Sequence, residues 1–291
     1  MSNLDRKFTL PGGRKLGYDE LGISTGKPVF YFHGTPSARV EWELFGLDAI
    51  ASKLGLRLIA VDRPGMGLSD FQPGRQIGDW PADVTALADG LGLGRFSVLG
   101  FSGGTPYALA CALKIPDRLV SAGLVGTEAP FILPGLTQGM NHQSLQFLEL
   151  NRDKPWLARL IQTSMALTAR LAPAALIAQA VKALPEADQA VLSQPVVQKA
   201  FVHTLLESMR RGTRGPQVDT ALMVSPWDFD TADIKFKVQM WQGEMDADAP
   251  PAMARHIKGV IPQSEITFYP QEAHLSLMAR HIEEILTTLI P

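Results

Sequence analysis

One serine in this sequence lies within a short glycine motif that is typical of a reactive turn, Gly100-Phe101-Ser102-Gly103-Gly104. An apolar run over Phe96 to Leu99 precedes the motif, and an apolar helix pattern begins at Pro106. A serine on a tight strand-to-helix turn presents its hydroxyl at the end of a sheet. The free N–H groups at the helix start favour negative charge there. The pattern therefore predicts that Ser102 is a nucleophile and that an oxyanion forms beside it.

Such a serine needs a base, because its hydroxyl is a poor nucleophile at neutral pH. His274 follows the last strand pattern, Glu265 to Tyr269, at the sheet edge where Ser102 is expected. Ligands bind at this edge of parallel sheets. We therefore assign His274 as the base. The other five histidines are interpreted as surface, packing or loop-shaping residues: His33, His142, His203, His256 and His281.

Three carboxylates compete to hold the imidazole, which needs an acceptor that fixes its tautomer. Asp246 follows the strand pattern Val238 to Gln242, and a residue just past a strand is held rigidly. Asp248 precedes two prolines and is expected to cap the next helix. Glu128 lies at the start of a long excursion from the sheet, so its position is less constrained. We favour Asp246 and keep Asp248 and Glu128 as alternatives.

The elements that must position these residues alternate between strand and helix. Two strand patterns flank Pro11-Gly12-Gly13 and predict an antiparallel start. Apolar runs typical of buried parallel strands then alternate with amphipathic helix patterns. The predicted strands are Phe8 to Leu10, Lys15 to Leu21, Pro28 to Phe32, Leu56 to Val61, Phe96 to Leu99, Leu119 to Val125, Val238 to Gln242 and Glu265 to Tyr269. We expect an α/β fold with a mostly parallel central sheet that helices cover on both faces.

Between the sixth and seventh predicted strands, the chain contains only helix patterns, which prolines punctuate at their starts. These patterns cover Thr137 to Leu150, Pro155 to Leu171, Pro173 to Ala183, Glu186 to Ser193 and Pro195 to Arg211. We therefore predict a first core part at residues 1–129, an inserted all-helical cap at 130–225 and a second core part at 226–291. We expect the cap to cover the site and to limit substrate size.

The order of the motifs resembles the α/β-hydrolase fold family, in its branch of serine hydrolases with a helical cap. The motifs that carry the resemblance are His33-Gly34-Thr35-Pro36, Asp62 to Ser69, Gly100 to Gly104, Gly243 to Asp246 and Ala273-His274. The resemblance implies a catalytic triad in the chain order Ser102, Asp246, His274. It also implies an oxyanion hole made by the backbone N–H groups of Thr35 and Gly103.

The motif Asp62 to Ser69 is interpreted as structural, because the resemblance gives it a loop-shaping role near the site. Asp62 and Arg63 are expected to form a local charge-paired turn. Cys111 lies in an apolar run and is expected to be a buried, inert thiol.

Composition excludes several classes of function. The formal net charge of the 291 residues is -2, which favours neither nucleic acid nor an anionic membrane as a partner. The sequence lacks a signal-peptide pattern, a run of about 18 apolar residues, a metal-ligand spacing and a dinucleotide motif. We expect a cytoplasmic protein that needs no cofactor or metal and acts on a small molecule. We leave open whether the protein forms a homodimer.

These observations favour a cofactor-independent serine hydrolase that cleaves carboxylic esters through an acyl-enzyme. A prolyl aminopeptidase of the same family is weakened as an alternative, because that branch usually carries Gly-Gly-Ser-Trp-Gly at the turn. A carbon–carbon bond hydrolase is a further alternative. Dehalogenases and epoxide hydrolases need an aspartate where this chain has Ser102. The alternative from another class is a ligand receptor that retains the triad.

Overall fold

The computed structural model describes residues 2–290 and contains one eight-stranded sheet in the order β1-β2-β4-β3-β5-β6-β7-β8. The strands are β1 (Asn3–Thr9), β2 (Lys15–Gly22), β3 (Lys27–Phe32), β4 (Leu56–Val61), β5 (Phe96–Phe101), β6 (Leu119–Val125), β7 (Val238–Gly243) and β8 (Glu265–Tyr269). β2 pairs antiparallel with β1 and β4, and every other pairing is parallel. The predicted fold class is confirmed, since the sheet is mostly parallel with an antiparallel start.

The middle of the sheet is formed by the strands with the longest apolar runs. Every residue of β5 is buried, and β3 and β4 are buried over their last four residues. Strands that are covered on both faces need such runs, because neither row of side chains meets water. β3 and β5 pair from Val29 with Ser97 to Phe32 with Gly100, so they end at the same level. The residues that follow both strands therefore lie at one edge of the sheet.

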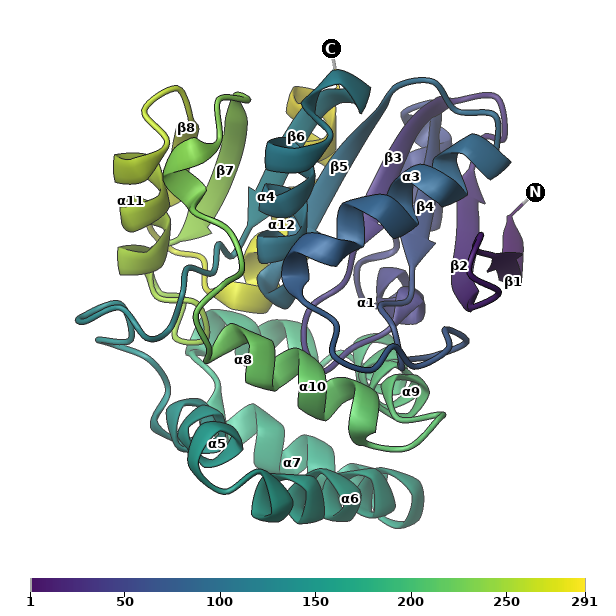
Figure 1. Cartoon of the computed structure of the whole chain (residues 1–291). Coiled ribbons are helices and arrows are strands. Elements are labelled where there is room, and N and C mark those ends of the chain that lie inside the picture. The colour runs from purple at the N-terminus through teal and green to yellow at the C-terminus, as the bar shows by residue number, and fades with distance from the viewer. Residues whose placement is uncertain (1, 291) are drawn as a thin grey trace.

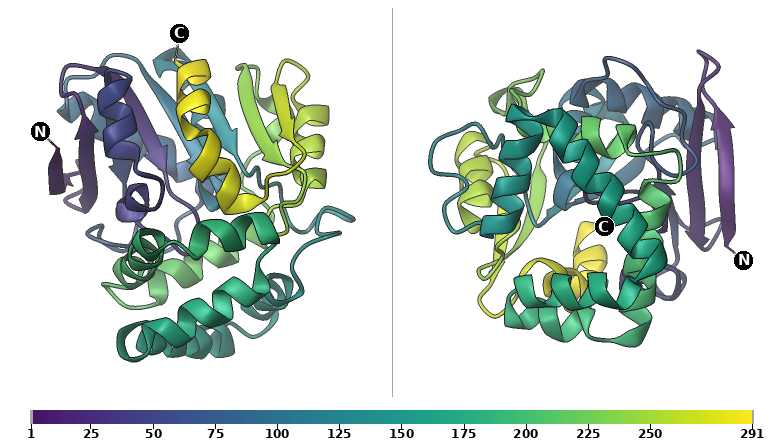
Figure 2. Two further views of the ribbon diagram at one scale, coloured as in Figure 1. Left: turned by 180° about the vertical axis from the view of Figure 1, so that it is seen from behind. Right: turned by 90° about the horizontal axis from the view of Figure 1, so that it is seen from below.

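Helices cover both faces of the sheet. One face carries α3 (Trp80–Gly90), α4 (Thr105–Lys114) and α11 (Pro251–Val260), as Figure 1 shows. The opposite face carries α1 (Trp42–Phe45), α2 (Leu47–Lys53) and α12 (His274–Leu289). This face is turned towards the viewer in the left panel of Figure 2. Each face has its own apolar core, with Val98 and Leu109 in the first and Leu99 and Leu277 in the second.

Six helices between β6 and β7 lie together beyond one end of the sheet (Figures 1 and 2). We call them the inserted helices: α5 (His142–Asp153), α6 (Pro155–Leu171), α7 (Pro173–Ala183), α8 (Glu186–Leu192), α9 (Pro195–Ser208) and α10 (Arg214–Met223). α6 and α7 have the predicted bounds, and both begin at a proline. α10 was not predicted as a separate helix, because Gly212, Gly215 and Pro216 interrupt the helical pattern there.

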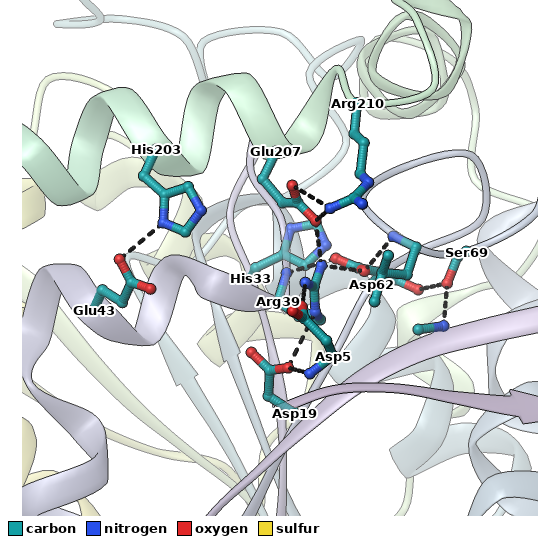
Figure 3. Close-up of polar contacts among 12 residues, drawn as sticks. Asp5, Asp19, His33, Arg39, Glu43, Asp62, Ser69, His203, Glu207 and Arg210 are labelled. Atoms are coloured by element: carbon teal, nitrogen blue, oxygen red, sulfur yellow. Dashed lines mark hydrogen bonds and ion pairs between the residues drawn. The ribbon is translucent and has the colours of Figure 1, made fainter. Parts of the chain in front are cut away.

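A buried arginine ties the inserted helices to the first strands. Arg39 donates to Asp19 at 3.1 Å, to Asp62 at 3.0 Å and to Glu207 of α9 at 2.6 Å (Figure 3). It also pairs with Asp5 of β1. The side chain of Arg39 is only 2% exposed, so its charge needs these carboxylates to be tolerated. The cluster thereby joins β1, β2, the loop after β4 and α9.

Candidate active site

The turn after β5 has the geometry that the glycine motif predicts. Ser102 has a φ of 52°, which an ordinary side chain adopts only under strain. A Cβ on Gly100 would lie 2.5 Å from the carbonyl oxygen of Gly104, and a Cβ on Gly104 would overlap the carbonyl oxygen of Phe32. The two glycines therefore allow a turn too tight for other residues. It passes directly into α4, which carries Pro106 in its first turn.

The structure brings Asp246 and His274 together behind this turn. Nδ1 of His274 lies 2.7 Å from Oδ2 of Asp246. Oδ1 of Asp246 accepts from the backbone N–H groups of Asp248 at 2.9 Å and Ala249 at 2.8 Å. Gln242 donates from its amide to Oδ2 at 3.2 Å. The carboxylate is thus fixed by three donors besides the imidazole, and its arrangement suits a group that orients a histidine.

The surroundings of His274 favour its charged form. Burial would lower the pKa of His274, but the carboxylate of Asp246 outweighs burial and raises that pKa above its ordinary value. The imidazole also packs against Phe101, the residue before Ser102, with ring centroids 4.8 Å apart. Gly126 follows β6 with a φ of 59°, and a Cβ there would lie 2.9 Å from Cε1 of His274. The absence of a side chain at Gly126 therefore leaves room for the imidazole.

Glu128, the third candidate acid, lies beside the serine. The Ser102 hydroxyl donates a long hydrogen bond of 3.5 Å to Oε1 of Glu128, while Oε2 is buried without a partner. Burial raises the pKa of Glu128 to about 8, although His274 and Arg63 act to lower it. Glu128 is therefore mostly protonated at neutral pH. It contacts the serine hydroxyl, whereas Asp246 holds the imidazole.

The turn at His33 to Pro36 is held at several backbone positions. Glu41 accepts from the N–H of Gly34 at 3.1 and 3.0 Å. Nδ1 of His33 donates to the Gly34 carbonyl at 2.8 Å, and Nε2 accepts from the Arg63 N–H at 3.3 Å. Burial, followed by the charge of Arg63, keeps the pKa of His33 well below its ordinary value. His33 thus occupies the loop-shaping position that was predicted.

Two predictions about nearby charges are wrong. Asp62 and Arg63 were expected to pair locally, but Asp62 pairs with Arg39 and Arg63 pairs with Asp219 at 2.7 Å. Asp248 was expected to cap α11, but Pro250 occupies the cap position and Asp248 accepts from Ser144 of α5 at 2.9 Å. In each case a partner distant in the sequence replaces the local one. Asp62 and Asp248 therefore each join two segments of the chain that are distant in the sequence.

Asp188 of α8 is a residue near the site that the sequence did not reveal. Its side chain is fully buried. It accepts from the backbone N–H of His274 at 3.1 Å and from that of Ser276 at 2.8 Å. A carboxylate at a helix N-terminus satisfies free N–H groups and interacts favourably with the helix dipole. An inserted helix therefore fixes the start of α12, where the imidazole is attached.

The remaining histidines lie away from Ser102 in surface or packing contacts. His203 contacts Glu43 at 2.9 Å (Figure 3), and His281 contacts Glu272 at 3.3 Å.

Among residues 2–290, no group of three or more His, Cys, Asp or Glu side chains could hold a metal ion. In the same part of the chain, no helix has the length and apolar character needed to cross a membrane. Cys111 is buried, as predicted, and burial raises its thiol pKa.

Little of the surface of Ser102 and His274 is exposed to solvent. Ser102 is 8% exposed and His274 is 6% exposed. Met223 of α10 lies over the turn, because a Cβ on Gly103 would overlap Cε of Met223. Two surface hollows, of about 600 and 550 Å³, are lined by other residues, such as Phe8 in one and Phe147 in the other. An inserted helix thus contacts the turn that carries the serine.

Comparison with known proteins identifies the family. The model of the α/β hydrolase fold matches residues 27–280, so the chain belongs to this family. A dihydrolipoyllysine-residue acetyltransferase component of an acetoin cleaving system from Pseudomonas putida is 27% identical over 279 residues, which cover 92% of this chain and 64% of that protein. A 2-hydroxy-6-oxo-2,4-heptadienoate hydrolase from Pseudomonas putida is 30% identical over 127 residues, which cover 42% of this chain and 45% of that protein. The chain thus covers less than two thirds of the length of these curated relatives.

The fold is shared with solved structures over almost its full length. An esterase from Rhodococcus sp. ECU1013 matches with a TM-score of 0.69 and 21% identity, over 99% of this chain and 98% of that one. The structural neighbours are esterases and other hydrolases of the same fold. By family and fold, the chain therefore belongs to the α/β hydrolases.

Proposed function

We propose that this hydrolase cleaves carboxylic esters without a cofactor, through a triad of Ser102, His274 and Asp246. The observation that carries the proposal is the 2.7 Å contact of Asp246 with His274, whose ring packs on Phe101, the residue before the strained Ser102. The structural resemblance to esterases supports the ester as substrate class.

In the first half of the proposed reaction, the Ser102 hydroxyl turns from Glu128 towards Nε2 of His274. The oxygen attacks the ester carbonyl while Nε2 takes the hydroxyl proton. Asp246 stabilises the imidazolium through Nδ1–H. The negative charge on the carbonyl oxygen is met by the N–H groups of Thr35 and Gly103. The carbon–oxygen bond then breaks, and the leaving alcohol takes the proton from Nε2.

In the second half, water attacks the carbonyl of the Ser102 ester, and Nε2 of His274 takes a proton from that water. A second oxyanion forms at the same two N–H groups. The bond to the serine oxygen breaks, and the proton on Nε2 returns to that oxygen. The acid leaves and the enzyme is restored. No electron acceptor or metal is needed for any of these steps.

The low exposure of Ser102 and His274 adds a requirement for substrate entry. We propose that the inserted helices act as a cap that moves to admit a substrate. Bond rearrangement would then occur in a site from which bulk water is excluded, where the oxyanion contacts are strongest. The pocket inside the cap would set the size of the acyl group.

Turnover of a panel of p-nitrophenyl esters tests the proposal. The wild-type chain should hydrolyse at least one ester, and Ser102→Ala should lower kcat by about 10³-fold or more with its fold retained. A variant that keeps more than about a tenth of kcat would exclude Ser102 as nucleophile. The same panel includes prolyl p-nitroanilide and a 2-hydroxy-6-oxo-dienoate. Turnover of the first alone would favour a prolyl aminopeptidase, and turnover of the second alone would favour a carbon–carbon bond hydrolase. If the folded chain hydrolyses none of these substrates, the result would favour a ligand receptor that retains the triad.

A further inference from the structure

A carboxylate on the last inserted helix is buried against the predicted oxyanion turn. Asp219 of α10 is fully buried. Arg75 donates to its Oδ1 at 2.6 Å, and Arg63 donates to its Oδ2 at 2.7 Å. The Tyr107 hydroxyl also donates to Oδ1 at 2.6 Å. The two arginines lower the pKa of Asp219 well below its ordinary range, although burial alone would raise it. The two ion pairs therefore favour the anionic form of Asp219.

The fourth donor to this carboxylate is the side chain of Thr35. Its hydroxyl donates to Oδ2 of Asp219 at 2.5 Å and accepts from Nη2 of Arg63 at 2.7 Å. Arg63 also donates to the carbonyl oxygens of His33 and Gly34. The side chain of Thr35 and two carbonyls of its turn thus converge on one ion pair. Since Thr35 lies beyond β3, its own N–H belongs to no sheet ladder, and these contacts fix its direction.

The same helix contacts the opposite side of the predicted oxyanion hole. A Cβ on Gly103 would overlap both the hydroxyl of Thr35 and Cε of Met223. Helix α10 starts close to the core, where a Cβ on Gly65 would lie 2.9 Å from the Cα of Gly215. The helix is therefore held at its first turn and reaches both residues whose N–H groups are predicted to bind the oxyanion.

We propose that Asp219 is a positioning residue that fixes the Thr35 N–H for the oxyanion, which makes the catalytic centre dependent on an inserted helix. This inference rests on the proposed hydrolase function. The proposed role of Asp219 depends on its hydrogen bond with Thr35 and not on its negative charge. Arg63, Arg75 and Asp219 together carry one net positive charge, which already favours an oxyanion nearby. Removing the carboxylate charge would increase that positive charge, so electrostatics alone predicts equal or faster turnover after Asp219→Asn.

Thr35→Val tests the inference with the least disturbance, because the backbone N–H and every charge stay in place. We expect kcat to fall by about 10- to 100-fold with little change in KM, since a displaced oxyanion donor acts on the transition state. Thr35→Ser restores the hydroxyl and should recover most of kcat. Asp219→Asn should also lower kcat, and combining it with Thr35→Val should add little, because both remove the same contact.

Glu207→Gln is the matched control. Glu207 is also a buried carboxylate on an inserted helix and also pairs with a core arginine, but its partner Arg39 bonds to other carboxylates and not to the turn at Thr35. The control should lower the free energy of unfolding and leave kcat within about threefold. A boronic acid that forms a tetrahedral adduct should bind about 10-fold or more weakly to Thr35→Val than to wild type or to Glu207→Gln.

The outcomes separate this inference from the proposed function. If the wild-type chain hydrolyses esters but Thr35→Val keeps kcat and boronic acid affinity within about twofold, the inference is overturned and the proposed function stands. Equal losses of kcat in Thr35→Val and Glu207→Gln would also overturn it, because they would indicate general loosening. If wild type hydrolyses nothing and binds no boronic acid, the proposed function fails first. Thr35→Val keeps the test decisive even if Asp219→Asn does not fold.

Discussion

Replacing Asp246 by asparagine changes one atom of the candidate site, and the structure indicates which way the new amide must face. Oδ1 of Asp246 accepts from two backbone N–H groups, those of Asp248 and Ala249. These donors cannot rotate away, so the asparagine oxygen must take the Oδ1 position. The NH₂ group then occupies the Oδ2 position, 2.7 Å from Nδ1 of His274. Nδ1 must accept a hydrogen bond there, and the imidazole proton moves to Nε2.

The amide of Gln242 loses one bond in this arrangement, because an NH₂ group at the Oδ2 position cannot accept from it. Gln242 donates to Oδ2 of Asp246 at 3.2 Å and to the carbonyl of Ala249 at 2.9 Å, while its oxygen accepts from the Thr127 N–H at 2.9 Å. Turning the Gln242 amide to suit the asparagine would break the last two bonds. The two backbone bonds at the Oδ1 position outweigh the one bond from Gln242, so the wrong tautomer of His274 should persist and Nε2 can no longer take the proton of Ser102.

We expect Asp246→Asn to lower kcat by about 10³- to 10⁴-fold, which is about 4 to 5 kcal/mol of barrier. The fold should be retained, because both backbone bonds to the Oδ1 position survive. The assay is kcat on the best ester of the panel, with circular dichroism as the check on folding. Asp248→Asn is the control, since an asparagine oxygen still accepts from Ser144, and it should leave kcat within a few-fold. A nearly silent Asp246→Asn beside an inactive Glu128→Gln would refute the assignment of the acid.

Three further predictions concern the pH dependence of the reaction and its substrate range. In wild type, the acid limb of kcat/KM against pH should lie above pH 6.5, because Asp246 raises the pKa of His274 and only the neutral imidazole is a base. In Asp246→Asn this limb should move to lower pH. An unchanged limb would contradict the coupling of Asp246 to His274. Glu128→Gln should match wild type at pH 7 and differ only above about pH 8, where Glu128 loses its proton, so a large loss at pH 7 would give Glu128 a direct role. Across acyl lengths from acetate to palmitate, kcat/KM should fall for the long chains, and a flat profile would count against a size-selective cap.

A fourth prediction concerns the contact of Asp188 with the start of α12. Asp188→Asn leaves one acceptor oxygen for two backbone N–H groups, so one bond is lost, and the free energy of unfolding should fall by about 1 to 2 kcal/mol. Urea denaturation measures this loss. Unchanged stability would indicate that the N–H groups of His274 and Ser276 find other acceptors.

The predictable part of this molecule is the part that local sequence determines. Strand patterns predicted the observed places of β2 to β8, whereas β1 begins at Asn3 and not at the predicted Phe8, because its first residues are polar and exposed. The glycines around Ser102 predicted a turn that only small neighbours allow. Prolines at helix starts gave the bounds of α6 and α7. The chain order of the motifs was sufficient to place Asp246 near His274, because the ends of neighbouring parallel strands meet at one sheet edge.

The partners of the buried charges were not predictable in the same way. Arg63 pairs with Asp219, 156 positions away, rather than with its neighbour Asp62. Asp188 caps a helix 86 positions away. A carboxylate in a polar helix stretch has the same local pattern whether it faces water or a guanidinium. Only the packing of the inserted helices against the sheet decides between the two.

Covalent labelling of the nucleophile tests the central claim most directly. The intact chain would be treated with a fluorophosphonate and its mass measured, with peptide mapping of any adduct and Ser102→Ala treated in parallel. We expect wild type to gain one phosphonyl group, on the peptide that contains Ser102, and the variant to gain none. A folded wild-type chain that gains no adduct, or a Ser102→Ala variant labelled to the same extent, would contradict the account.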